Sequence, residues 1–115
     1  MVDVEARQRA RSIAQSRGLG GLANDTKWAE FFAAIVALRA AVEIKLIDSD
    51  QVFGCGVVWT PVPGYVEGAG NMGPVLYTFI EWVRSSAVEQ VAAAARTVGL
   101  EVDVRDQFVT VYGYR

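Results

Sequence analysis

Apolar residues recur along the first third of the chain with the period of an α-helix. Residues 3–17 place small apolar side chains along one side, and the glycines within 18–21 end this helix in a flexible connection. Farther on, TKWAEFFAAIVAL repeats apolar side chains at i, i+3, i+4 and i+7. With Asp25 or Thr26 as its cap, this segment predicts a second helix that ends near Leu38 and packs on a sheet.

From residue 41 the period changes to two, which is typical of half-buried strands. Residues 41–46 alternate in this way, and 52–60 form the expected returning strand after a turn at 48–50. Four larger side chains share one face of the second strand: Phe53, Cys55, Val57 and Trp59. On its other face Gly54 and Gly56 leave a bare patch. We expect a helix of the same fold to cover that patch, with a ligand or another chain as the alternatives.

The densest run of aromatic and β-branched residues, VLYTFIEWVR at 75–84, predicts a strand packed on both faces. Ser86 follows, with a glutamate three residues later as in a capping box, and starts a third helix. Gly99 is placed to end that helix in the left-handed conformation. Residues 100–104 and 108–114 then alternate around a polar turn, which predicts a closing hairpin.

Residues 60–74 have the proline- and glycine-rich composition of a long loop, a kind of segment that is often functional or mobile. Within it GAGNMG, at 68–73, matches the spacing of the dinucleotide-binding fingerprint. That motif works only between a strand and a helix, because the helix N-terminus must meet the pyrophosphate. Here Pro63 and Gly64 interrupt the approach and a strand-like segment follows, so we expect no nucleotide site.

The predicted elements follow the order α-α-β-β-β-α-β-β. Short turns between consecutive strands favour antiparallel pairing. We therefore expect an α+β fold, with an antiparallel sheet of about five strands and helices packed on one of its faces. The 115 residues are expected to form a single domain, 1–115, in which the first helix and the glycine linker, 1–21, are loosely attached.

Composition restricts the chemistry that this chain can carry. It has no histidine, which excludes Ser-His-Asp and Cys-His mechanisms and removes the commonest metal ligand. The net charge of -2 makes nucleic acid a poor partner. The amino terminus lacks the apolar core of a secretory signal, and the apolar stretches are too short for a membrane span. One cysteine fits a reducing compartment, so we expect a cytoplasmic protein without cofactor, metal or membrane contact.

Two features that often carry chemistry are expected to be structural in this chain. Cys55 lies on a predicted buried strand face, and no cation is expected beside it that would lower the pKa of its thiol. Asp48 and Asp50 suit a turn, because the twelve-residue pattern of a calcium loop is absent.

The remaining candidates are one acid and several aromatic residues. Glu81 stands among core residues, where it either faces solvent or pairs with an arginine such as Arg84 or Arg105. The alternative is a general acid or base, or a charged anchor for a partner. Exposed aromatic side chains are enriched in binding hot spots, although sheet packing explains each of them equally well. The candidate binding residues are Trp59, Tyr65, Glu67, Glu81, Tyr112 and Tyr114.

Three separated segments are also familiar in combination. ANDTKW at 23–28, FIEW at 79–82 and VYGYR at 111–115 resemble a family of small uncharacterised bacterial proteins with an NDTKW helix start, a central IEW strand and a terminal YGYR. The glycine-rich loop 60–74 departs from the tryptophan- and acid-rich segments of that family. The resemblance implies a small, acidic α+β domain, which is similar to the immunity proteins of bacterial toxin systems.

Three functions follow as hypotheses. The first is a non-enzymatic protein-binding domain, of the kind that inhibits a bacterial toxin as an immunity protein. The second is a small-molecule-binding or enzymatic domain that uses Glu81 and the 60–74 loop. The third is a structural homodimer that pairs edge strands across a two-fold axis, most simply those of the hairpin.

Overall fold

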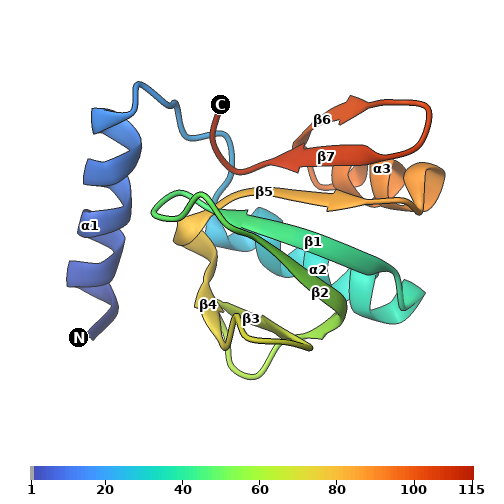
Figure 1. Ribbon diagram of the computed structural model, residues 1–115, viewed down its shortest axis with the longest axis horizontal. Helices are drawn as coiled ribbons and strands as arrows, with labels where there is room; N and C mark the ends of the chain where they lie inside the picture. The colour runs from blue at the N-terminus through green and yellow to red at the C-terminus, as the bar shows by residue number, and fades with distance from the viewer. Residues whose placement is uncertain (1) are drawn as a thin grey trace.

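Within residues 2–115, which the computed structural model describes, the chain forms three helices (Figure 1). They are α1 (Val2–Ser16), α2 (Asp25–Leu38) and α3 (Val88–Thr97). The predicted second helix is confirmed, and its cap is Asn24 rather than the expected Asp25 or Thr26. The side-chain oxygen of Asn24 accepts a hydrogen bond from the Lys27 N–H at 2.8 Å, which satisfies one of the free donors of the first turn.

The sheet has seven strands in the described part of the chain, not about five as the sequence predicts. Neighbouring strands pair antiparallel in the spatial order β4-β3-β2-β1-β5-β7-β6 (Figure 1). The strands are β1 (Ala41–Leu46), β2 (Val52–Trp59), β3 (Tyr65–Gly68), β4 (Val75–Leu76), β5 (Ile80–Ser85), β6 (Glu101–Val104) and β7 (Val109–Tyr112). The α+β class and the antiparallel sheet are therefore confirmed, whereas the strand number and the element order are wrong.

The two additional strands come from segments whose strand pattern is short. Residues 60–74 contain β3, which has only four residues and is surrounded by prolines and glycines. The loop-like composition of this segment therefore hides the short strand pattern. The run 75–84 is not one strand, because a 3-10 turn at Tyr77–Phe79, labelled η1, separates β4 from β5. The Tyr77 N–H donates to the Gly64 carbonyl at 2.9 Å, which holds η1 beside the loop that leads into β3.

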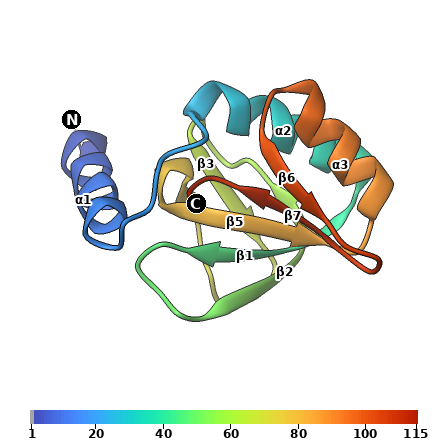
Figure 2. The ribbon, with the colours of Figure 1, turned by 90° about the horizontal axis from the view of Figure 1, so that it is seen from above.

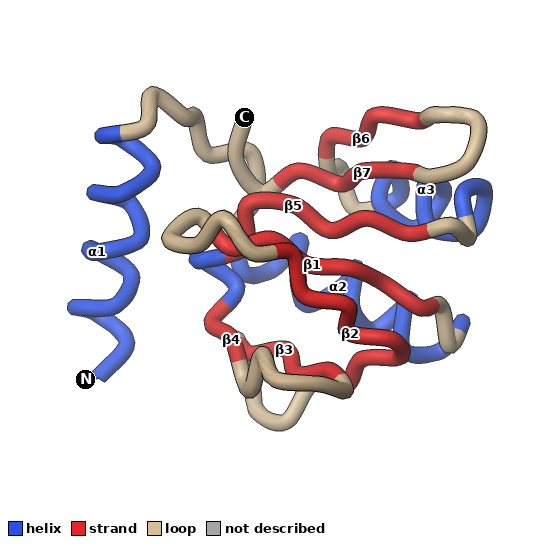
Figure 3. Tube along the Cα trace, viewed as in Figure 1, coloured by secondary structure: helices blue, strands red, loops and turns tan. Residues whose placement is uncertain are grey.

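The elements form two layers with one helix outside them. α2 and α3 lie side by side on one face of the sheet, and none of the three helices lies on the opposite face (Figures 1 and 2). α1 runs across the ends of the strands and meets the remainder of the fold mainly at η1 (Figure 3). The expectation that helices pack on one face is confirmed for α2 and α3 but not for α1. Ala10 and Ala14 of α1 are nevertheless buried.

The core lies between the sheet and the two helices that cover it. The apolar stripe of α2 supplies four buried residues: Trp28, Phe31, Phe32 and Ile35. Trp28 stacks on Phe32, which stacks in turn on Tyr77, with ring centroids 5.5 Å apart in both pairs. Such aromatic pairs contribute about 0.5–1.5 kcal/mol beyond the area that they bury. This aromatic column fixes η1 against α2.

A bulge in β2 changes which residues face the core. Gly56 has a φ of 58°, a left-handed conformation that suits glycine. The register of β1 with β2 shifts next to it, where Val42 pairs with Gly56 but Glu43 pairs with Gly54. Cys55 and Val58 are consequently buried, whereas Val57 and Trp59 are exposed. The prediction that Val57 and Trp59 share the face of Cys55 is therefore wrong.

The bare patch at Gly54 and Gly56 is not covered by a helix, contrary to the expectation. Both glycines are exposed, and the register places Gly54 opposite the exposed Glu43 on the helix-free side. α2 instead covers the side of β2 from which Cys55 and Val58 point inward. The patch is therefore part of an open surface.

α3 begins differently from its prediction. Its cap is Ala87, which makes no side-chain capping hydrogen bond, so the predicted capping box at Ser86 is wrong. The buried Ser85 hydroxyl instead donates to the Ala41 carbonyl at 2.8 Å and accepts from the Ala87 N–H at 3.2 Å. A buried hydroxyl needs such partners, and they turn the chain into the helix. Gly99, with a φ of 80°, follows the helix end as predicted, and the closing hairpin of β6 and β7 is confirmed.

The segments 23–28, 79–82 and 111–115 meet at one junction. The Gly113 N–H donates to the Glu81 carbonyl at 2.8 Å, and the Trp28 indole lies beside Gly113. A Cβ on Gly113 would overlap the Ile80 carbonyl oxygen and would lie 3.0 Å from Trp28 Cζ2. The close approach of α2 to β5 and the C-terminal segment therefore requires glycine at this position.

We expect Gly113→Ala to lower the free energy of unfolding by about 3 kcal/mol, because overpacking a closed site displaces the surrounding backbone. Gly54→Ala is the matched control, since a Cβ there meets no heavy atom within 4 Å and the φ of Gly54 is not left-handed. Urea unfolding followed by tryptophan fluorescence measures both variants. Equal stability of Gly113→Ala and the wild type would contradict the packing described for this junction.

Candidate functional site

The helix-free face of the sheet gathers aromatic side chains from β5 and β7. Trp82 lies opposite Tyr112, and Arg84 lies opposite Thr110, in antiparallel register. Phe108 directly precedes β7 and contacts Arg84. Tyr112 and Phe108 are half-buried, as are Trp82 and Arg84. We call these five residues the Arg84 cluster.

The Arg84 guanidinium is held between two aromatic rings. Its Cζ lies 4.3 Å from the ring centroid of Trp82 and 4.5 Å from that of Phe108. Its Nε donates a hydrogen bond to Thr110 Oγ1 at 3.2 Å. Cation–π contacts of this kind contribute about 0.5–1 kcal/mol each at exposed sites. Together the three contacts fix the guanidinium in one orientation.

The positive charge of Arg84 is not neutralised by any carboxylate of the described residues. Five ion pairs form within 4.0 Å among those residues, and none of them involves Arg84. Glu43 lies directly opposite Arg84 on β1, yet the two side chains form no ion pair. A planar guanidinium presents several N–H donors that match a carboxylate in geometry. Arg84 is therefore oriented and charged on an open surface.

A second arginine on the same face differs in this respect. The Arg115 guanidinium lies over the Tyr112 ring, with Cζ 4.5 Å from the centroid. Its Nη1 also forms an ion pair with Glu101 Oε1 at 3.1 Å. The charge of Arg115 is thus already paired, which singles out Arg84 within this surface.

Two open depressions flank the cluster. One of them has a volume of about 460 Å³ and lies between the Glu43 and Arg84 side chains. Its floor is formed by residues of the two neighbouring strands β1 and β2: Ala41, Val42, Gly54 and Gly56. The other depression, of about 770 Å³, lies towards the turn of the hairpin at 103–107.

Three of the predicted binding residues lie together on β2 and β3. Trp59 is 45% exposed and lies opposite Glu67. Tyr65 is half-buried and belongs to the same strand as Glu67. Tyr112 is not part of this group, because β1 and β5 separate β7 from β2.

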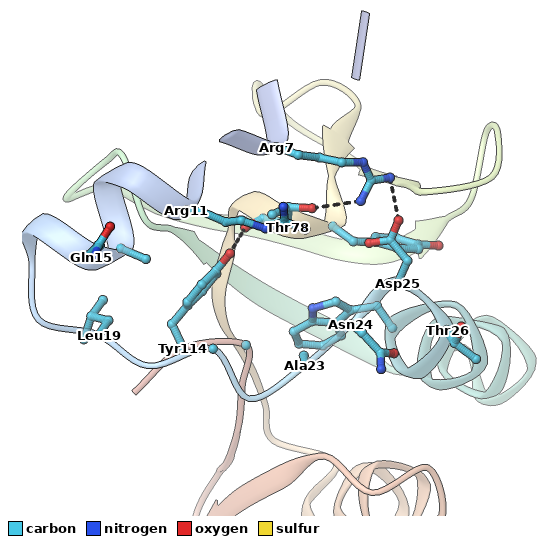
Figure 4. A pocket seen from close by; sticks show the side chains of 15 residues that line it. Arg7, Arg11, Gln15, Leu19, Ala23, Asn24, Asp25, Thr26, Thr78 and Tyr114 are labelled. Carbon is cyan, nitrogen blue, oxygen red and sulfur yellow. Dashed lines mark hydrogen bonds and ion pairs between the residues drawn. The ribbon is translucent and has the colours of Figure 1, made fainter. Parts of the chain in front are cut away.

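Tyr114 is buried, and its side chain makes contacts within the fold. Its hydroxyl donates a hydrogen bond to the Thr78 carbonyl at 2.6 Å, beside the cleft that α1 covers (Figure 4). Burial raises the pKa of the Tyr114 phenol above its ordinary value. The side chain therefore contributes little to an exposed aromatic surface.

Glu81 is held by cations from two other elements. Its Oε1 accepts hydrogen bonds from Arg17 Nη1 and from Lys45 Nζ, both at 2.7 Å. Arg17 directly follows α1, and Lys45 belongs to β1. The expected pairing of Glu81 with Arg84 or Arg105 is therefore wrong. The partners come from segments that only the tertiary fold brings near.

A bulge in β5 sets the orientation of Glu81. Lys45 pairs with Trp82 and Leu46 pairs with Ile80, so that Glu81 is the extra residue between them. Burial by itself would raise the pKa of Glu81, but the hydrogen bonds and charges of the two cations outweigh it and hold the pKa below its ordinary value. Glu81 is consequently kept ionised, whereas a general acid must be protonated.

The Cys55 thiol is buried between β2 and the GAGNMG segment. Its Sγ lies 3.7 Å from Met72 Sδ. Burial, and to a smaller extent the Glu43 carboxylate, raises the pKa of the Cys55 thiol to about 11. The thiol is therefore protonated at neutral pH, in line with the predicted structural role. A Cβ on Gly68 would lie 2.5 Å from the Cys55 Cβ, so the first glycine of GAGNMG is needed for packing.

A cleft of about 730 Å³ separates α1 from the start of α2 (Figure 4). Arg7 spans it, forming an ion pair with Asp25 Oδ2 at 2.5 Å and donating to Thr78 Oγ1 at 3.3 Å. A neighbouring cleft of about 640 Å³ lies beyond this ion pair and is lined partly by residues 60–64. Both clefts therefore lie where Arg7 of α1 meets the start of α2.

Four residues of the Arg84 cluster are absent from the predicted binding residues: Trp82, Arg84, Phe108 and Thr110. The run 75–84 is so rich in apolar residues that it predicts packing on both faces. A weaker signal is present within it, because Trp82 and Arg84 alternate with Val83 as in a half-buried strand. Phe108 and Thr110 belong to the alternating segment 108–114, but their contacts with Arg84 depend on the register of β7 against β5.

We expect Glu81→Gln to lower the free energy of unfolding near pH 7 by about 1–3 kcal/mol, because two charge-assisted hydrogen bonds lose the acceptor charge. The pKa of Glu81 is lower in the folded state, so its ion pairs stabilise fully above the ordinary value of 4.5. That stabilisation is lost as the pH falls through the folded-state pKa. Urea unfolding over this range should show the wild type and the variant converging at low pH; a constant difference would contradict the ion-pair assignment.

Comparisons with known proteins add no identity to these observations. No protein-family model matches the chain, and comparisons with curated proteins and with solved structures found no significant match. Within residues 2–115, no group of three or more cysteine and acidic side chains could hold a metal ion. In the same residues, every helix is too short or too polar to cross a bilayer.

Proposed function

We propose that this chain is a non-enzymatic protein-binding domain whose docking surface is the Arg84 cluster. The observation that carries the proposal is the Arg84 guanidinium, which is fixed between Trp82 and Phe108 without an ion pair to any described carboxylate. Arginine, tryptophan and tyrosine are the residues enriched in interface hot spots. A side chain that is already oriented loses little conformational entropy on binding, so more of the contact energy contributes to affinity.

The environments of the candidate catalytic groups also favour binding over catalysis. Arg17 and Lys45 both bind Glu81 Oε1 and hold the pKa of this carboxyl below its ordinary value, which keeps it ionised. The Cys55 thiol is buried and its pKa is raised to about 11. A carboxyl with a lowered pKa is a poor general acid near neutral pH and a weak general base, and a buried protonated thiol is a poor nucleophile.

Within this class, we propose an immunity-type inhibitor of a bacterial toxin that acts in the cytoplasm. The resemblance of three segments to a family of small bacterial proteins supports this assignment. The junction of Trp28, Gly113 and Glu81 gives a physical reason for those segments to occur together, since each one contributes a contact to it. The acidic composition, with a net charge of -2, agrees with the character of such inhibitors.

Binding to the product of the neighbouring gene tests the proposal directly. We expect Arg84→Ala to weaken this binding by roughly tenfold or more, because truncation of a hot-spot residue costs about 2 kcal/mol. Arg96→Ala is the matched control, since Arg96 is exposed on α3 on the other side of the sheet. Isothermal titration calorimetry should give the same affinity for this control and the wild type.

The outcome has two independent parts. If Arg84→Ala is folded by circular dichroism and binds as tightly as the wild type, the partner does not dock on the Arg84 cluster. Co-expression with the neighbouring gene tests the inhibitor assignment, because the chain should restore growth that the neighbour suppresses. An absence of both binding and growth rescue would contradict the inhibitor proposal.

A second candidate function, small-molecule binding, is favoured by the cleft at α1. Its volume of about 730 Å³ is in the range of ligand sites, which is roughly 300–1,000 Å³. Glu81 does not line it or the neighbouring cleft, so a ligand there would not use Glu81 together with the 60–74 loop. A thermal-shift screen with small carboxylates and phosphates tests this candidate. Stabilisation that is lost in Arg11→Ala would support it, and no shift with any compound would count against it.

A further inference from the structure

We propose that the depression beside Arg84 receives an apolar side chain of the partner, next to a partner carboxylate that pairs with Arg84. The inference rests on the proposed function and specifies its partner. That partner is a protein segment in which an apolar residue and an aspartate or glutamate project from the same side. The geometry of the depression and the charges at its border both point to this chemistry.

The floor of the depression is mostly bare backbone. Gly54 and Gly56 contribute no side chains, and Ala41 beside them contributes one methyl group. A Cβ on Gly54 meets no heavy atom within 4 Å, so the space above this strand is open. Phe108 supplies an aromatic wall on the side of Arg84. An apolar side chain could therefore lie flat on the strands and lose contact with water.

The border of the depression carries one charge of each sign, and the two charges differ in their environment. Glu43 is exposed and forms no ion pair with a described residue, so water screens its charge strongly. Arg84 is half-buried, stacked between two rings and bound to Thr110. A charge in a less polar environment interacts more strongly with an incoming ion. The depression consequently favours a carboxylate over an ammonium group.

The neighbouring cation on this face does not change that balance. Lys45 lies on β1 two residues after Glu43, and its Nζ is bound to Glu81 Oε1 at 2.7 Å. Its ammonium group is therefore engaged within the fold, and because Arg17 shares the same carboxylate, the three groups keep a net charge of +1, which also favours an incoming carboxylate. Arg84 is the cation that an incoming carboxylate can pair with at this border.

N-acetyl-phenylalanine is a suitable probe, because it joins an aromatic side chain to a carboxylate. Its neutral amide replaces the carboxylate by a carboxamide, and the cationic phenylalanine amide additionally replaces the acetamide by an ammonium group; both keep the aromatic ring. Each probe is titrated into the isotope-labelled chain while NMR follows the backbone signals of Gly54 and Gly56 and the Nε signal of Arg84. We expect saturable shifts of these signals with the carboxylate, weaker shifts with the neutral amide and none with the cation.

Three variants test the separate parts of the depression, each by the dissociation constant of the carboxylate probe. Gly54→Val adds a side chain over the floor, with its Cβ in open space, and should weaken binding about fivefold or more. Arg84→Gln should have an effect of similar size, whereas Glu43→Gln should strengthen binding about twofold because it removes a weak repulsion. Ala93→Leu adds bulk to the exposed side of α3 and is the matched control, with wild-type affinity expected.

Several outcomes would overturn the inference. They are an absence of shifts with the carboxylate probe, tighter binding of the cation, and unchanged binding by a folded Gly54→Val. Failure of the proposed function gives a different result. A natural partner whose affinity falls with Arg84→Ala but not with Gly54→Val would leave the function standing and exclude the apolar depression. A partner unaffected by Arg84→Ala would exclude the function itself.

Discussion

The fold depends on the hydrogen bonds that converge on Glu81. Its backbone carbonyl accepts from two consecutive N–H groups near the end of the chain, those of Gly113 at 2.8 Å and Tyr114 at 3.1 Å. Its carboxylate accepts from Arg17 and Lys45. One residue thereby connects β5 to the segment after α1, to β1 and to the C-terminal segment. Elements that are far apart in the sequence are held in one arrangement around it.

The bulge at Glu81 also determines which side chains reach the helix-free face. With one extra residue in the strand, Ile80 and Val83 are both buried in the core. Trp82 and Arg84 consequently lie on the opposite side of β5. α2 and α3 cover only the core side and α1 lies across the strand ends, so these two residues stay accessible (Figure 2). Glu81 and Val83 thus make the contacts within the fold, whereas Trp82 and Arg84, which alternate with them along β5, make the proposed binding contacts.

The elements with local signals could be predicted from the sequence, and the features that depend on register could not. The stripe of α2 and the alternation of the hairpin depend on residues close in the chain, and both are confirmed. The bulges at Gly56 and Glu81 depend on how neighbouring strands align, so the predicted faces of β2 are wrong. For the site, Trp59 and Glu67 do lie together, because they are cross-strand neighbours. Arg84 could not be selected, because only the Trp82 ring is near it in the sequence, whereas the fold brings Phe108 and Thr110 to it.

On β5, Glu81 is assigned to the stability of the fold and Arg84 to binding. The most direct test of this separation compares the two residues in the same two measurements. Glu81→Gln and Arg84→Gln are each measured for their free energy of unfolding and for their affinity towards N-acetyl-phenylalanine. We expect Glu81→Gln to lose about 1–3 kcal/mol of stability and to bind within about twofold of the wild type. We expect Arg84→Gln to lose about 1–2 kcal/mol of stability with its two cation–π contacts and to bind about fivefold more weakly. Equal losses of affinity in both variants, or a loss of stability without a loss of affinity in Arg84→Gln, would contradict the separation.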